Sequence, residues 1–219
     1  MIPRRFRGPL NSGNGGYVAG RLAGVLGGVV EVTLRRPPAL DRPLRLERVD
    51  DALELFDGDL LVAEARVASL ELEPPPGAPS FSEAAAAPEA PPWWGTEEYD
   101  ECFSCGMRGE GDGLEIHPRP FDGFVAAPWV AVEVSTGIVW SAIDCSGAYA
   151  VGGPGRGEPL LARMTARVDR LPAEGDRCVV VGWPIEEDGR KLHAGTALYG
   201  ADGDPIAVSR QLWIVPAAL

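Results

Sequence analysis

One carboxylate of this sequence lies in an unusually apolar stretch. Asp144 falls within residues 137–151, where apolar or small residues recur with the spacing of one helix face. That stripe comprises Val139, Ile143, Gly147 and Val151. Ser135 and Thr136 offer caps, so we expect a helix over residues 137–151. A carboxylate in this setting either accepts hydrogen bonds from a backbone group or an arginine, or it takes part in proton transfer. Asp144 is therefore the candidate catalytic base.

Two cysteines form a C-x-x-C motif, Cys102 and Cys105, within the sequence Cys-Phe-Ser-Cys-Gly. A zinc ribbon needs a second pair at similar spacing, whereas Cys145 and Cys178 are single. A redox motif of this kind should open a helix after a strand, but a glycine-rich stretch follows here. We expect a structural turn and no metal. A nucleophilic role for Cys145 would need a histidine base, and none lies near it in the sequence.

A glycine-rich helix is predicted over residues 14–27, with Asn14 as its N-cap. One stripe of this helix is apolar, and a second consists of the glycines at positions 16, 20, 24 and 28. Each helical glycine costs about 1 kcal/mol relative to alanine, so the stripe indicates that another backbone packs closely there. A dinucleotide-binding loop is excluded because the glycine spacing is wrong and no apolar strand precedes it.

Composition and charge narrow the class of protein. The chain has 219 residues and a formal net charge of −12, which argues against nucleic acid and anionic membranes as partners. No apolar run reaches the roughly 18 residues that a membrane span needs, and the apolar segment 22–30 lacks the flanks of a signal peptide. Four cysteines do not make a disulfide scaffold at this length. We expect a cytoplasmic protein with reduced thiols.

A segment rich in proline and alanine divides the chain. Residues 74–96, which end in Trp93 and Trp94 before Gly95 and Thr96, show neither strand nor helix periodicity. This composition predicts an extended, partly polyproline-like linker. The predicted domains are therefore residues 1–73 and 97–219, joined by the linker 74–96.

The two parts of the chain resemble each other. Residues 35–42 and 170–177 share the pattern R-x-P-x-x-x-D-R. In each part a short strand follows, then an Asp-Gly turn, at Asp57–Gly58 and Asp188–Gly189, and then a longer strand. A third turn, at positions 202–203, precedes the last strand, predicted over residues 205–215. This order of elements favours a duplicated domain.

One helix followed by antiparallel strands, present twice, describes a duplicated hotdog fold of the α+β class. Residues 14–23, Asn-Gly-Gly-Tyr-Val-Ala-Gly-Arg-Leu-Ala, resemble the glycine-rich start of the first hotdog helix in double-hotdog acyl-CoA thioesterases of the thioesterase II type. Residues 189–213 look like the last hairpin of hotdog thioesterases. The resemblance implies a tandem (double) hotdog, each half a curved antiparallel sheet wrapped around one helix.

The resemblance also implies three site residues. In double-hotdog members an Asp on the second helix, a Thr on the following strand and a Gln on the last strand position the attacking water. These match Asp144, Thr165 and Gln211. Period-two alternation puts Gln211 on the same face as Ser209 and Trp213. Thr165 is also a good strand former, and a buried Gln211 needs hydrogen-bond partners for purely structural reasons.

The start of the first helix supplies the other predicted site residues. The N–H of Gly15 or Gly16 could hold the oxyanion, because helix N-termini favour developing negative charge, and of the two we expect Gly16 to be the donor. Asn14, Gly15 and Trp140 would lie beside the ligand, with Trp140 narrowing the pocket. The first helix carries no acid, so one chain would offer one complete site built from both halves.

The expected activity is hydrolysis of an acyl-CoA or acyl-carrier thioester by water, with no cofactor, in a homodimer. The candidates for binding CoA phosphates are Arg35, Arg36, Arg42, Arg45 and Arg48. A hotdog that binds an acyl ligand or only assembles is the alternative. A hydratase ranks last, because it needs an Asp and a His acting together, and neither His117 nor His193 falls on a predicted helix.

Overall fold

The computed structural model describes residues 1–75, 77–88, 97–109, 111–152 and 158–216. Ten strands form one antiparallel sheet in the order β2-β3-β4-β1-β7-β10-β9-β8-β6-β5. The strands are β1 (Val30–Leu34), β2 (Arg45–Val49), β3 (Ala52–Asp57), β4 (Leu60–Val67), β5 (Arg119–Phe121), β6 (Phe124–Val130), β7 (Leu160–Val168), β8 (Arg177–Asp188), β9 (Lys191–Tyr199) and β10 (Pro205–Ile214).

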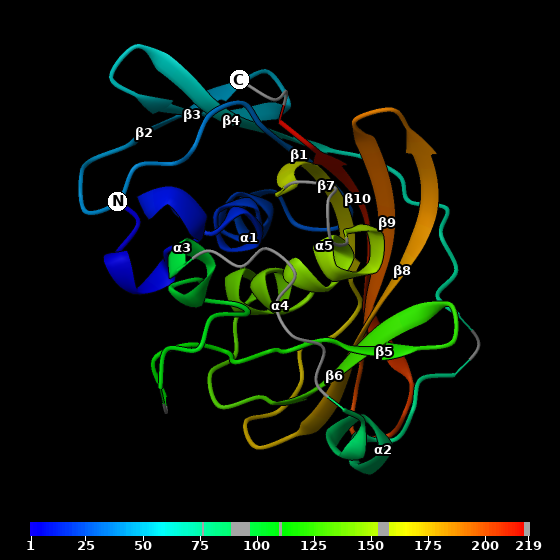
Figure 1. Ribbon diagram of the computed structural model, residues 1–219. Coiled ribbons are helices and arrows are strands. Elements are labelled where there is room, and N and C mark those ends of the chain that lie inside the picture. Colours follow the sequence, from blue (N-terminus) through cyan, green and yellow to red (C-terminus); the bar gives the residue numbers. More distant parts are fainter. Residues whose placement is uncertain (76, 89–96, 110, 153–157, 217–219) are drawn as a thin grey trace.

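The curved sheet wraps around the central helices (Figure 1). The α-helices are α1 (Gly15–Leu26), α2 (Phe81–Ala86), α3 (Glu97–Asp100), α4 (Thr136–Ala142) and α5 (Cys145–Val151), and two short 3-10 helices, η1 (Arg4–Phe6) and η2 (Pro9–Asn11), precede α1. Helix α1 packs against β1, β4 and α4, while α5 packs against β8 and β9. The main hydrophobic core lies between α1, α4 and the inner face of the sheet.

The two halves repeat the same topology. After α1 the strands are ordered β2-β3-β4-β1, and after α5 they are ordered β8-β9-β10-β7. The shared R-x-P-x-x-x-D-R segments follow β1 and β7, which are equivalent strands. These two strands pair with each other, Val30 opposite Ala166 and Glu31 opposite Thr165, and thereby join both halves into one continuous sheet.

The strand order matches the hairpin turns of the two halves differently from the repeat seen in the sequence, which paired Asp57–Gly58 with Asp188–Gly189. Asp57–Gly58 joins β3 to β4, and Asp188–Gly189 joins β8 to β9. Because β3 is equivalent to β9, the counterpart of Asp57–Gly58 is the third turn, at positions 202–203, which joins β9 to β10. All three Asp-Gly turns are hairpins, and each glycine has a positive φ that other residues rarely adopt.

The second predicted helix is broken, which corrects the expectation of one helix over residues 137–151. Helix α4 ends at Ala142 and α5 begins at Cys145. The N–H of Gly147 bonds to the carbonyl of Asp144, three residues back, at 3.1 Å. The carbonyl of Ile143 is therefore free of the helix ladder, and it accepts instead from the side-chain amide of Gln211 at 2.8 Å.

The predicted linker is not extended throughout. It contains helix α2, whose start is fixed by a reciprocal capping box between Ser80 and Glu83. Phe81 and Ala84 pack against the outer face of the sheet. The sequence Ser-x-x-Glu is a helix-start signal that outweighs the surrounding prolines. Trp93 and Trp94 lie outside the described residues.

The helices of the described segments are all too short or too polar to span a bilayer.

Candidate active site

The carboxylate of Asp144 lies against the N-terminus of α1, which comes from the other half of the chain. Its Oδ2 accepts from the backbone N–H of Gly16 at 2.9 Å and from the side-chain amide of Asn14 at 3.1 Å. Asn14 also caps α1, since its Oδ1 accepts from the N–H of Tyr17 at 2.8 Å and from the Ser141 hydroxyl at 2.9 Å. The structure thus brings together four of the expected site residues, Asp144, Asn14, Gly15 and Gly16.

Asp144 combines burial with one unused oxygen. The residue is 3 % exposed, and its Oδ1 has no hydrogen-bond partner among the described residues. Burial raises the pKa of Asp144 to about 7, and the hydrogen bonds from Gly16 and Asn14 oppose that rise only in part. A carboxyl group with these properties is suited to proton exchange near neutral pH.

A cavity of about 350 Å³ adjoins this carboxylate. Its wall is mostly apolar, with contributions from the loop after β1, from β7 and from the end of β10. The site residues in the wall are Asn14, Gly15, Cys102, Cys105, Asp144 and Cys145. An apolar cavity of this size with a few convergent polar groups is typical of a small-molecule site.

The two glycines that begin α1 differ in what their N–H groups do. The N–H of Gly16 is already bound to Asp144, so the structure does not leave it free for an oxyanion. The N–H of Gly15 has no hydrogen-bond acceptor among the described residues, and Gly15 lines the cavity. The structure therefore corrects the expected oxyanion donor, because the N–H available to a ligand is that of Gly15 and not that of Gly16.

Gln211 lies behind Asp144 and outside the cavity wall, which corrects its expected place beside the attacking water. Its Nε2 donates to the carbonyl of Ile143 and lies 3.1–3.2 Å from the hydroxyls of Ser209 and Thr196. Its Oε1 accepts from Nε1 of Trp213 at 2.8 Å, which confirms that these two side chains share a face. Gln211 therefore fixes the α4–α5 break, where Asp144 sits.

Thr165 lies on the opposite face of the sheet, and this corrects its expected place beside the water. Met164 pairs with Gln211 across β7 and β10, whereas Thr165 pairs with Arg210 on the other face. Its hydroxyl donates to Glu31 at 3.2 Å. Because side chains alternate along a strand, Thr165 and Gln211 cannot both face α5 in this register.

Trp140 is a core residue and not part of the cavity wall. It is 1 % exposed and packs where α1 and α4 cross. A Cβ placed on Gly20 would lie 2.6 Å from Cβ of Trp140. The expected contact between Trp140 and a ligand is therefore replaced by helix packing.

Two of the five candidate arginines line the cavity, Arg35 and Arg36. Arg35 pairs with Glu64, while Arg36 is exposed and has no ion-pair partner among the described residues. Arg42 and Arg45 pair with Asp57 and Glu47 away from the cavity, and Arg48 lies on the exposed strand β2. Arg36 is thus the uncommitted cation at the cavity.

Sequence reasoning missed the position of Cys145. This residue, treated above as single, lies beside the C-x-x-C motif, with its sulfur 3.7 Å from that of Cys102. The pairing depends on the break after α4, for which residues 137–151 carry no local signal.

Comparison with known proteins finds similar solved structures but no matching sequence family. The sequence matches no protein-family model and no curated protein. Among solved structures it is similar to a conserved protein of unknown function with a hot dog fold from Alicyclobacillus acidocaldarius, at 12 % identity and a TM-score of 0.64, covering 100 % of this chain and 92 % of that one.

Two further neighbours are a tesB protein and an acyl-CoA thioesterase II. The tesB protein of Mycobacterium avium subspecies paratuberculosis is 14 % identical with a TM-score of 0.60, covering 95 % of this chain and 91 % of that one. An acyl-CoA thioesterase II from Mycobacterium marinum is 9 % identical with a TM-score of 0.55, covering 96 % and 92 %. This chain therefore has a double-hotdog fold like that of these neighbours, which match 95–96 % of it.

Proposed function

We propose that this protein hydrolyses acyl-CoA thioesters, with Asp144 as the general base. The observation that carries the proposal is the unpartnered Oδ1 of a buried carboxylate at the wall of an apolar cavity. The name of a neighbour with the same fold, an acyl-CoA thioesterase II, supports the substrate class.

In the proposed reaction Oδ1 of Asp144 takes a proton from water as the water oxygen bonds to the thioester carbonyl carbon. The N–H of Gly15 donates a hydrogen bond to the resulting oxyanion. This stabilisation requires no reorganisation of the protein, because α1 already holds the N–H group in place. The carbon–sulfur bond then breaks. The departing thiolate takes the proton from Asp144, which regenerates the carboxylate.

Asn14 and Gly16 have a positioning role in this scheme. They hold Oδ2 through two hydrogen bonds, so Oδ1 is the carboxylate oxygen left without a partner among the described residues. Gln211 acts one step further away, through the Ile143 carbonyl next to Asp144. Arg36 at the cavity is the proposed contact for a phosphate of the CoA carrier.

The experiment that tests the proposal measures thiol release from short, medium and long acyl-CoAs. Asp144→Asn keeps the shape and one acceptor oxygen for the Gly16 N–H but removes the base, so kcat should fall by roughly 10²–10⁴-fold. The matched control is Glu31→Gln, which changes a carboxylate on the other face of the sheet. If Asp144→Asn still hydrolyses the thioesters at the wild-type rate, Asp144 is not the general base.

A non-catalytic acyl-ligand carrier is the second candidate, favoured by the engagement of Oδ2 and the Gly16 N–H with each other. Absence of thiol release at every chain length, together with binding of an acyl-CoA, would select it. Binding is measured by calorimetry on the full chain.

A further inference from the structure

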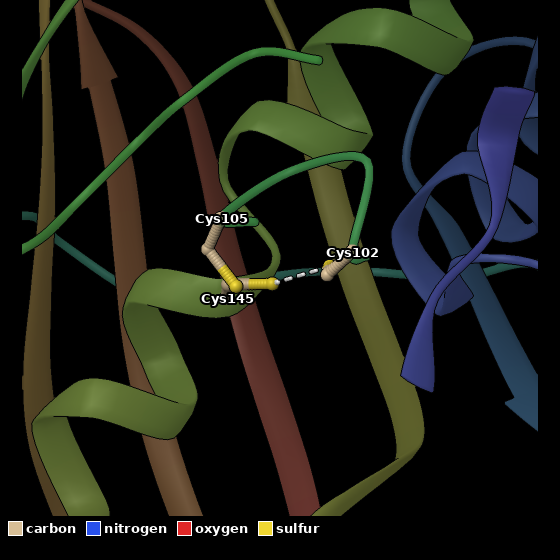
Figure 2. A group of neighbouring side chains, drawn as sticks. All are labelled: Cys102, Cys105 and Cys145. Atoms are coloured by element: carbon tan, nitrogen blue, oxygen red, sulfur yellow. Dashed lines mark hydrogen bonds between the residues drawn. The ribbon is translucent and has the colours of Figure 1, made fainter. Parts of the chain in front are cut away.

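Three buried thiols from two distant segments meet at one point. Cys102 and Cys105 come from the loop after α3, and Cys145 is the first residue of α5. Figure 2 shows the three side chains converging. Their sulfurs all lie within 4.8 Å of one another, and all three residues are free cysteines.

The spacing of the sulfurs suits a shared ion better than a covalent bond. The sulfurs of Cys102 and Cys145 are 3.7 Å apart. A disulfide needs about 2.0 Å between sulfurs. Thiolates bound tetrahedrally to zinc at about 2.3 Å lie about 3.8 Å apart. The observed separation is the one that a zinc ion would need.

The surroundings of Cys102 are those of a thiolate ligand. The side-chain amide of Asn14 donates a hydrogen bond to its sulfur at 3.7 Å. A neutral thiol is a weak acceptor, whereas a thiolate gains from each donor. Such a donor beside a ligating atom is typical of the outer shell of a metal site.

The turn between the two cysteines is tightly constrained. The N–H of Gly106 bonds to the carbonyl of Cys102 at 2.8 Å. A Cβ on Gly106 would lie 2.4 Å from the carbonyl oxygen of Asp100 and 2.5 Å from that of Cys102, so only glycine fits. This close turn directs the sulfurs of Cys102 and Cys105 to the same side.

We propose that Cys102, Cys105 and Cys145 form a binding site for a Zn²⁺ ion, whose fourth coordination position opens to the cavity beside Asp144. All three cysteines line that cavity, so a water molecule can complete the tetrahedron. Soft thiolate ligands select zinc over magnesium or calcium. On binding, the three thiol protons pass to solvent and three sulfur–zinc bonds form, with no change of oxidation state.

The ion would connect the loop after α3 to the start of α5. The two segments are 40 or more residues apart in the sequence, and α5 begins directly after the proposed base. The site is independent of the proposed hydrolysis, because a zinc ion can fasten these segments in a protein that only binds its ligand.

The test measures metal content rather than activity. The full chain is purified in reducing buffer without chelator, and zinc is determined by mass spectrometry of the elements. We expect one zinc per chain in the wild type and in Cys178→Ala, which changes the remaining cysteine, located in the core. Cys105→Ser and Cys145→Ser should each lose most of the bound zinc on dialysis.

Cobalt gives a second readout that does not depend on the variants folding. Co²⁺ added to the metal-free wild type should produce the near-ultraviolet thiolate-to-cobalt bands and the visible bands of a tetrahedral site. An added small thiol should shift the visible bands if the fourth position is open; an unchanged spectrum would refute the open position.

Three results would overturn the site itself. The first is a reduced wild type that binds neither zinc nor cobalt. The second is zinc retained at the wild-type level in Cys145→Ser, which would place the ion elsewhere. The third is a Cys102–Cys145 disulfide, found by peptide mapping of protein kept under reducing conditions.

Discussion

The carboxylate of Asp144 accepts a hydrogen bond from the backbone N–H of Gly16 at 2.9 Å, although 128 positions separate the two residues. This contact crosses from one hotdog half to the other. It is possible because a Cβ on Gly16 would lie only 2.6 Å from Cβ of Asp144 and from the carbonyl oxygen of Trp140. The small residues of α1 therefore place the base as well as pack the helices.

The glycines of α1 should differ sharply in their tolerance of alanine. Gly20→Ala would put a Cβ 2.6 Å from that of Trp140, and such overpacking costs about 1–3 kcal/mol. Gly24→Ala meets nothing closer than 3.7 Å and gains up to about 1 kcal/mol of helix propensity. Thermal unfolding should show Tm lowered by several degrees in the first variant and unchanged or raised in the second. Equal effects would contradict close packing at Gly20.

Thr165→Val should leave hydrolysis almost unchanged. The substitution removes one hydrogen bond to Glu31 on the outer face of the sheet, which is worth about 1 kcal/mol or less. We expect kcat/KM within about twofold of the wild type, equivalent to about 0.4 kcal/mol. Steady-state thiol release measures this. A hundredfold fall in kcat, with the free energy of unfolding unchanged, would show that Thr165 does help to position the attacking water.

Gln211→Leu should lower both stability and kcat. The variant leaves the Ile143 carbonyl and Nε1 of Trp213 without their buried partner, at about 1–3 kcal/mol for each group. Because Asp144 follows Ile143 directly, the loss of this hydrogen bond also leaves the Asp144 carboxylate less well positioned, which lowers kcat. The residues of the cavity wall are unchanged, so KM should change less than kcat.

Ser209→Ala is the matched control for Gln211. It removes a hydroxyl 3.1 Å from the same amide but leaves the bond to Ile143 in place. Denaturant unfolding and initial rates should separate the two variants. If Ser209→Ala lowers kcat as much as Gln211→Leu does, the effect comes from general loosening of the core and not from the Ile143 contact.

Arg36→Ala should weaken use of CoA thioesters more than use of a thioester that lacks phosphates. One exposed arginine–phosphate contact is worth about 1 kcal/mol, so KM for acyl-CoA should rise about fivefold. KM for the corresponding N-acetylcysteamine thioester should be unchanged.

Arg48→Ala is the control for Arg36, since it removes the same charge from β2, away from the cavity. Salt titration adds a second check, because a phosphate contact weakens as ionic strength rises. Equal KM changes for both thioesters in Arg36→Ala would show that this residue does not contact the carrier.

The sequence by itself determined the elements whose signals are local. Asn14 followed by a small-residue stripe predicts α1, because a side-chain cap and close helix packing are both visible within a dozen residues. Asp-Gly pairs between apolar runs predict the hairpins, since only particular backbone angles close so short a turn. The repeated order of these elements, together with the family resemblance, predicted a duplicated hotdog, although it matched the turn at Asp57–Gly58 to the wrong turn of the second half.

Only the tertiary structure decided which side chains meet. The break at Asp144 depends on an amide from Gln211, 68 residues beyond Ile143, and no helix periodicity contains that partner. The face of Thr165 depends on strand register, and a shift of one residue would reverse it. Cys145 reaches the C-x-x-C motif because α5 starts where the helix breaks. Caps and turns are fixed by neighbours along the chain, whereas a site is fixed by long-range contacts that the chain order does not reveal.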